Sequence, residues 1–229
     1  MCFSSTWSAS SFWIIVVTAT LAVVKGMDPR IPAAMYFFAM KEAIQYLLYK
    51  NLTTCNRTNE ILTTLSWVHI SFHPFFVLLF IQAFSRRPEM YHIPLGMSLV
   101  YAVFNILRIH QRNIYDACVP RTSPNIGLCQ KTTCSYPGKH HLAYGFKLQS
   151  GDSGAMTPNM FTYILLMLIV PLIVGDWPVP VANILLIILV YIIISPHNFG
   201  EASAIWCMFA FVFAGFVLWS LATGRKYYP

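Results

Sequence analysis

The chain has 229 residues, of which 57% are hydrophobic, 15% aromatic and only 10% charged, and its mean hydropathy is +0.59. A soluble domain does not need so much apolar sequence, so this composition excludes an ordinary soluble fold. The formal net charge of +7 comes without a basic stripe of interleaved aromatic residues, so nucleic acid is not an expected partner. We expect an all-α, polytopic protein whose first partners are membrane lipids.

Apolar stretches that are long enough, or nearly long enough, to cross a bilayer follow one another along the chain. They predict a helix bundle of seven transmembrane helices near residues 11–25, 32–50, 61–84, 90–109, 159–175, 178–195 and 202–222. No Lys or Arg precedes Lys25, so the first stretch is interpreted as a retained helix and not as a cleaved signal. Residues 1–229 are expected to form a single membrane domain.

Cys2 stands two residues before Ser4, which with Ser5 is a favourable N-cap residue for the first helix. The positive end of a helix dipole favours the thiolate form of a cysteine. Cys2 is therefore a candidate nucleophile or metal ligand. The alternative is an inert cysteine.

The second helix carries a polar face within an apolar sequence. At the spacing i, i+3, i+4 and i+7, one side of this helix collects Glu42, Gln45, Tyr46 and Tyr49. Ionisable groups are costly in lipid, so this face is expected to point into the bundle. Because Lys41 points about 100° away from Glu42 around the helix, Glu42 is expected to find its partner on another helix.

The connection after the second helix contains two glycosylation sequons, at residues 51–53 and 56–58, and would make the protein a glycoprotein in a suitable host. The predicted outer loops hold an even set of cysteines, Cys55, Cys118, Cys129 and Cys134. Such a set is compatible with two disulfide bonds in an oxidising compartment, in a pairing that the sequence leaves open. Three of these cysteines lie in the long connection over residues 110–157, which favours an ordered cap, a candidate lid, over a flexible linker.

The third helix places His69 and His73 at i and i+4, directly before Pro74. Two histidines at this spacing can hold one divalent metal ion as a cofactor only if a third ligand comes from elsewhere. That ligand would have to be Glu42, Glu201 or a cysteine. The alternative is that both histidines are hydrogen-bonded packing residues between helices.

The seventh predicted helix carries Glu201 and Cys207 in its first two turns. In a seven-helix topology these groups share the outer half of the bundle with Glu42, His69 and His73. A polar cavity that opens outward is the simplest way to house them in a membrane.

Lys and Arg residues in short loops set the orientation, because they resist translocation. One side of the predicted bundle collects Lys25, Arg30, Arg86, Arg87, Arg225 and Lys226, whereas the opposite short loops offer only Lys50 and Arg57. This bias predicts an integral membrane protein with an extracytoplasmic N-terminus, a cytoplasmic C-terminus and the long loop between the fourth and fifth helices outside.

Short motifs occur along the chain in the order Met1–Ser4, Lys41–Gln45, Pro74, His141–Tyr144, Pro171, Gly175, Asn183 and Glu201–Cys207. Together they resemble a family of functionally uncharacterised seven-span membrane proteins that begin Met-Cys-Phe/Trp-Ser and carry a Trp-Cys motif in the last helix. The resemblance covers nearly the whole chain and implies the fold but no known reaction. It also implies that Cys2 and Cys207 belong to one site.

Three functions are compatible with such a site. The first is a membrane-embedded enzyme that acts on a lipid or small amphipathic substrate, with a cysteine as nucleophile, a histidine as base and carboxylates as acids or orienting groups. The candidate catalytic residues are Cys2, Glu42, His73, Glu201 and Cys207. The second function is binding of a small molecule or metal without chemistry, as a receptor or conduit. The third is an accessory subunit of a complex with other membrane proteins.

Overall fold

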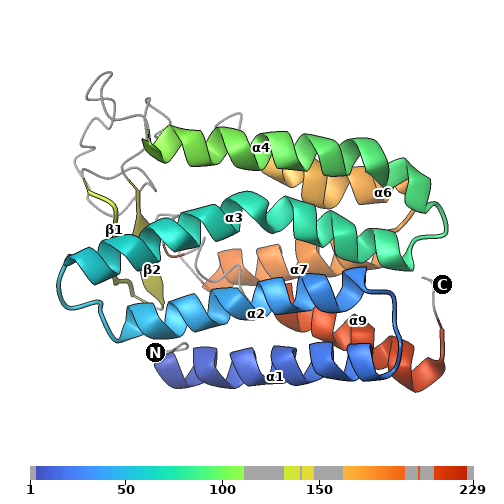
Figure 1. Ribbon diagram of the computed structural model, residues 1–229, viewed down its shortest axis with the longest axis horizontal. Helices are drawn as coiled ribbons and strands as arrows, with labels where there is room; N and C mark the ends of the chain where they lie inside the picture. The colour runs from blue at the N-terminus through green and yellow to red at the C-terminus, as the bar shows by residue number, and fades with distance from the viewer. Residues whose placement is uncertain are drawn as a thin grey trace.

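The computed structural model describes residues 4–110, 132–139, 141–146, 162–193, 201 and 209–225, which form a mostly helical protein (Figure 1). Its helices are α1 (Ser5–Val24), α2 (Arg30–Tyr49), α3 (Arg57–Phe84), the single-turn η1 (Pro88–Tyr91), α4 (His92–His110), the π-helical η2 (Leu165–Ile169), α6 (Val170–Val174), α7 (Pro178–Ile193) and α9 (Phe209–Thr223). Because η2 and α6 are parts of one helix, Thr162–Val174, the described residues form seven helices apart from η1.

Each predicted apolar stretch overlaps one of these helices. Among the described residues, three helices are long and apolar enough to cross a membrane: Ser5–Val24, Arg57–Phe84 and Pro88–Leu107. Shorter apolar helices cover Thr162–Val174, Pro178–Leu189 and Ala210–Thr223. The helix α2 is in neither group, in keeping with Lys41 and Glu42 in its sequence.

Side-chain caps explain why α1 and α3 begin before the apolar pattern does. The backbone N–H of Trp7 donates to Ser4 Oγ at 3.3 Å, and the backbone N–H of Asn59 donates to Asn56 Oδ1 at 2.9 Å. Each bond satisfies an amide that the first helical turn leaves unpaired. The predicted N-cap role of Ser4 is confirmed.

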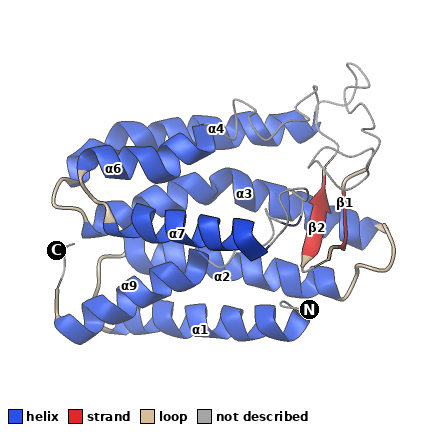
Figure 2. Cartoon of the chain, turned by 180° about the vertical axis from the view of Figure 1, so that it is seen from behind, coloured by secondary structure: helices blue, strands red, loops and turns tan. Residues whose placement is uncertain are grey.

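The helices lie alongside one another, and α1, α2, α3 and α4 are neighbours in chain order (Figure 1). Helix α9 packs against α1 and α2, while α7 contacts both α9 and η2 (Figure 2). The N-terminus lies at the same end of the bundle as the two strands, and the C-terminus lies at the other end (Figure 1).

Apolar side chains fill the interior and also cover the outside of the bundle. Inside, the Phe213 ring stacks on the Phe38 ring with centroids 4.6 Å apart. Outside, the side chains of Trp13, Val100 and Ile173 are 63%, 72% and 75% exposed. Such a surface would be unfavourable in water but suits contact with lipid chains.

The long connection contains a hairpin of two antiparallel strands, β1 (Cys134–Pro137) and β2 (Leu142–Gly145). The sequence pattern predicts a cap there but no strands, so the hairpin is an addition to the predicted fold. A disulfide bond joins Cys134 of β1 to Cys55, between α2 and α3. One predicted disulfide is therefore confirmed, while Cys118 and Cys129 lie outside the described residues.

Candidate functional site

The polar face of α2 is buried inside the bundle. The side chains of Lys41, Glu42 and Gln45 are all less than 5% exposed. Tyr46, which the helical spacing predicts on the same face, is instead exposed. Lys50 Nζ lies 5.5 Å from the centroid of its ring. The buried face is therefore narrower than predicted, because the helix turns Tyr46 to the outside.

Glu42 is a buried acidic group with incomplete hydrogen bonding. Its carboxyl group lies within interaction distance of the Ser8 side chain on α1, but neither Glu42 Oε2 nor Ser8 Oγ has a partner with regular hydrogen-bond geometry. Ser66 Oγ on α3 is also buried without a partner. A buried acceptor without a donor is unfavourable by about 1–3 kcal/mol, so the neighbouring oxygens of Glu42 and Ser8 mark a place that could receive a hydrogen-bonding ligand.

Lys41 and Gln45 contact the hairpin. Lys41 Nζ lies 4.4 Å from the centroid of the Tyr144 ring, and Gln45 Nε2 donates to the Tyr144 hydroxyl oxygen at 3.2 Å. We use the name polar cluster for Ser8, Lys41, Glu42 and Gln45. Tyr144 covers part of this cluster. The sequence did not reveal this role, because Gln45 and Tyr144 are 99 positions apart in the chain.

The two histidines of α3 already have protein partners. His69 Nε2 donates to the backbone carbonyl of Phe37 at 2.8 Å. The imidazole ring of His69 also stacks on the Phe37 ring, with centroids 3.9 Å apart. His73 Nδ1 is 2.7 Å from the hydroxyl of Tyr163. The two imidazole centroids are 6.4 Å apart. These are contacts that packing residues make between helices.

A metal site would need further ligands beside His69 and His73. Within the part of the chain that the structure describes, no group of three or more His, Cys, Asp or Glu residues could hold a metal ion. The other candidate ligands Cys2 and Cys207 lie outside that part. Their predicted meeting with Glu42 and His73 therefore stays a prediction.

The Glu201 carboxylate is hydrogen-bonded to the backbone of the hairpin turn. Its Oε2 accepts the backbone N–H of Lys139 at 3.2 Å, and its Oε1 accepts the backbone N–H of His141. Gly138 lies against this carboxylate, since a Cβ there would come within 2.9 Å of Glu201 Cδ and would also clash with the His141 carbonyl oxygen. Glu201 therefore positions the hairpin, and its two oxygen atoms are occupied by backbone donors.

Asn59 holds β1 against α3. Its Nδ2 donates to the Ser135 carbonyl at 2.9 Å, and its Oδ1 accepts the Ser135 N–H at 2.8 Å. The amide thus pairs with a strand residue as a neighbouring strand would. Thr63 adds a contact between hydroxyl groups, 2.8 Å from Ser135 Oγ. Asn59 is fully buried in the first turn of α3. Neither this burial nor its partner on β1 could be found from the sequence.

His141 lies outside the predicted spans and is buried beside the same hairpin. Its Nδ1 accepts the Leu142 N–H at 2.8 Å and lies 3.2 Å from the Tyr49 hydroxyl. Burial lowers the pKa of His141 to about 3, and the positive charge of Lys41 acts in the same direction. Its imidazole is therefore neutral at physiological pH.

The pH dependence of stability follows from this lowered pKa. Between about pH 3 and 6.5 the unfolded chain binds a proton at His141 that the folded chain does not, so stability is full above pH 6.5 and falls as the pH drops. From pH 7 to pH 5 we expect His141 to account for a loss of about 2 kcal/mol. Thermal unfolding in detergent should show this loss in the wild type and less of it in His141→Asn. Equal pH dependence in both proteins would contradict the prediction.

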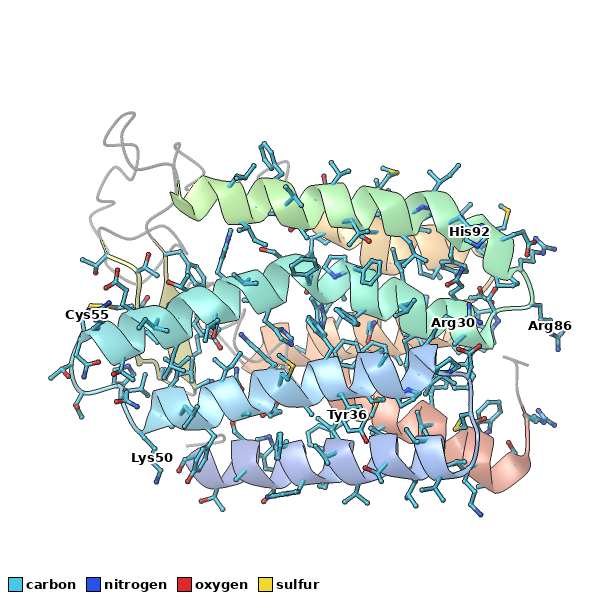
Figure 3. The ribbon with its side chains drawn as sticks, in the orientation of Figure 1. Arg30, Tyr36, Lys50, Cys55, Arg86 and His92 are labelled. Atoms are coloured by element: carbon cyan, nitrogen blue, oxygen red, sulfur yellow. A yellow bond between two sulfur atoms is a disulfide. The ribbon has the colours of Figure 1, made fainter. Side chains whose placement is uncertain are left out.

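The two ends of the bundle differ in their surface chemistry. Figure 3 shows Lys50 and Cys55 at the end with the hairpin, and Arg30, Arg86 and His92 at the opposite end. At that opposite end Arg30 forms an ion pair with Asp28, with 2.6 Å between Nη2 and Oδ2.

Residues 8–225 match the model of a family of unknown function, DUF5765, and the chain belongs to that family. Neither a curated protein nor a solved structure matches the chain.

Proposed function

We propose that this member of a family of unknown function is a multi-pass membrane protein that binds a lipid or small amphipathic molecule at its polar cluster. The ligand reaches the cluster from the extracytoplasmic side. Its polar end carries a hydrogen-bond donor, an amine or a hydroxyl, because the group that it meets is the carboxylate oxygen of Glu42.

All seven helices cross the membrane in this proposal, with the N-terminus outside. Two observations support the orientation. The disulfide Cys55–Cys134 favours an oxidising compartment for its end of the bundle. The arginine-bearing turns lie at the opposite end (Figure 3), as expected for a cytoplasmic side. The two glycosylation sequons fall on the outer side in the same orientation.

The unpartnered oxygen of Glu42 is the observation that carries the binding proposal. Glu42 is seven residues before the end of α2 at Tyr49, so it lies about 10 Å below the outer end of that helix. A carboxyl group at this depth is costly unless a donor reaches it. The headgroup of an amphipathic molecule can supply the donor, while its chain contacts the apolar helices.

A catalytic form of the proposal requires Cys2 or Cys207 as the nucleophile, with His69 or His73 as the base. His69 Nε2 and His73 Nδ1 are engaged by protein partners, and the two cysteines are outside the described residues. We therefore confine the proposal to binding. Turnover of a bound amphiphile that disappears in Cys2→Ser or Cys207→Ser would add a reaction to it.

Photocrosslinking of the purified protein in lipid nanodiscs tests the proposal. The probe is a long-chain amino alcohol with a photoactivatable group and an alkyne tag, and the comparison probe is a carboxylic acid of the same chain length. We expect the amino alcohol to label peptides of α1 and α2, and the acid to label them weakly. In Glu42→Gln the labelling should fall about tenfold, because the charge-assisted hydrogen bond is lost.

Glu60→Gln is the matched control, since Glu60 is an exposed carboxylate in the first turn of α3. Its labelling should equal that of the wild type. Equal labelling of the wild type and Glu42→Gln would contradict the proposed site.

A further inference from the structure

The two strands of the hairpin are attached to the bundle in different ways. The first strand, β1, is fixed by the disulfide Cys55–Cys134 and by the paired amide of Asn59 on Ser135. The second strand, β2, contains no cysteine, so its contacts with the helices, such as the hydrogen bond between Gln45 and Tyr144, are noncovalent. The hairpin therefore has a permanent attachment on the β1 side and a reversible one on the β2 side.

One face of β2 covers the outer side of the polar cluster. Leu142, Tyr144 and Phe146 alternate along the chain, so they share one face, and all three are fully buried in a cluster with Leu48 and Trp67. Gln45, which bonds the Tyr144 hydroxyl, stands one helical turn nearer the outer end of α2 than Glu42. A ligand that approaches Glu42 along this face of α2 meets Tyr144 first.

The backbone of the turn between the strands is held by the Glu201 carboxylate, which comes from a distant segment of the chain. The Glu201 carboxylate accepts the N–H groups of Lys139 and His141, and the missing side chain of Gly138 leaves room for it. Hydrogen bonds to a carboxylate are strong, yet they can be broken and remade without any covalent change.

We propose that the hairpin is a hinged lid over the polar cluster, attached through Cys55–Cys134 and latched by Glu201. Opening separates Tyr144 from Lys41 and Gln45 and gives an amphiphile access to Glu42 from outside. The apolar face that opening exposes on β2 is one that the chain of the amphiphile can cover. This inference rests on the proposed binding function, whose access it regulates.

Cysteine accessibility tests the lid without any added probe of the binding site. Gln45→Cys places a thiol beneath Tyr144, and Lys50→Cys places a control thiol at the exposed end of the same helix. A charged, membrane-impermeant maleimide reacts with each protein in nanodiscs, and mass spectrometry of the peptide that contains the new cysteine gives its labelling rate. With the native hairpin we expect residue 45 to react about tenfold or more slowly than residue 50.

Two second substitutions release the latch in different ways. Gly138→Ala pushes the turn away from Glu201, and Glu201→Gln removes the charge while retaining the shape of the side chain. Either one should raise the labelling rate at residue 45 about tenfold and leave residue 50 unchanged. Gly96→Ala is the matched control, since a Cβ at Gly96 meets nothing within 4 Å, and it should change neither rate.

An unchanged rate at residue 45 in folded Glu201→Gln would overturn the lid, even if Gly138→Ala fails to fold. Equal rates at residues 45 and 50 with the native hairpin would overturn it as well. Because the labelling rates are measured without the photocrosslinking probe and at residues other than Glu42, these outcomes are independent of the photocrosslinking result, and the lid and the binding function can fail separately.

Discussion

Asn59→Ala should lower the free energy of unfolding by about 2–4 kcal/mol, because it leaves the buried N–H and carbonyl of Ser135 without partners. The substitution also removes the acceptor for the Thr63 hydroxyl. Chemical unfolding in detergent, followed by tryptophan fluorescence, measures the loss.

Thr64→Ala provides the control for this experiment on the same helix. The Thr64 hydroxyl donates only to the carbonyl of Glu60, at an exposed position, so its removal should change stability by less than about 0.5 kcal/mol. A loss in Asn59→Ala as small as that in Thr64→Ala would show that the hairpin is not held by this amide.

The double variant Cys55→Ser/Cys134→Ser should also be less stable than the wild type, by about 2–4 kcal/mol. The disulfide closes a loop between residues 79 positions apart, and without it the unfolded chain gains conformational freedom. A dithiol reductant should cause a comparable loss in the wild type, in which the two thiols of the reductant are oxidised as the protein disulfide is reduced. The double variant should not respond through this bond.

Peptide mapping under nonreducing conditions checks the bond itself. The expected product is a linked pair of peptides containing Cys55 and Cys134. A peptide in which Cys55 is linked to Cys118 or Cys129 would contradict the arrangement of the hairpin.

The helical part of the fold could be predicted from sequence because hydropathy is a local property. Each apolar stretch overlaps a helix, and the errors at the starts of α1 and α3 come from the caps Ser4 and Asn56, which extend a helix beyond its apolar residues. Whether these helices cross the membrane depends on their surroundings, and by length and composition three of them among the described residues are long and apolar enough to do so.

The hairpin could not be predicted in the same way. Its strands are four residues each, too short for a pattern of alternation to stand out in a polar connection. They are held by contacts with distant residues, above all the disulfide to Cys55, the amide of Asn59 and the carboxylate of Glu201. Such contacts follow from the tertiary structure and leave no local pattern.

The candidate site was partly accessible to sequence reasoning. The cost of charge in hydrocarbon correctly placed Glu42 and Gln45 inside the bundle, but the same reasoning placed Tyr46 there, and Tyr46 is exposed. An aromatic hydroxyl can lie at a helix surface at little cost, so the spacing rule is weaker for it. Lys41 was overlooked as a site residue because its position over the Tyr144 ring depends on the hairpin.

Glu201 shows that residue type alone does not reveal which groups a carboxylate contacts. A carboxylate at the start of a membrane helix is a reasonable candidate for acid–base chemistry. In the structure both of its oxygens accept backbone N–H groups of the hairpin turn, which makes it a positioning residue. Glu42, by contrast, retains an oxygen without a partner, and it is the carboxylate on which the proposed function depends.

A crystal structure of the wild-type protein grown in a lipid mesophase tests that dependence most directly. The binding proposal predicts non-protein density that enters from the hairpin end and places a donor atom about 3 Å from Glu42 Oε2, beside Ser8. A Glu42 carboxylate that faces lipid, or whose oxygens are both bonded to protein side chains in a dry interior, would contradict it.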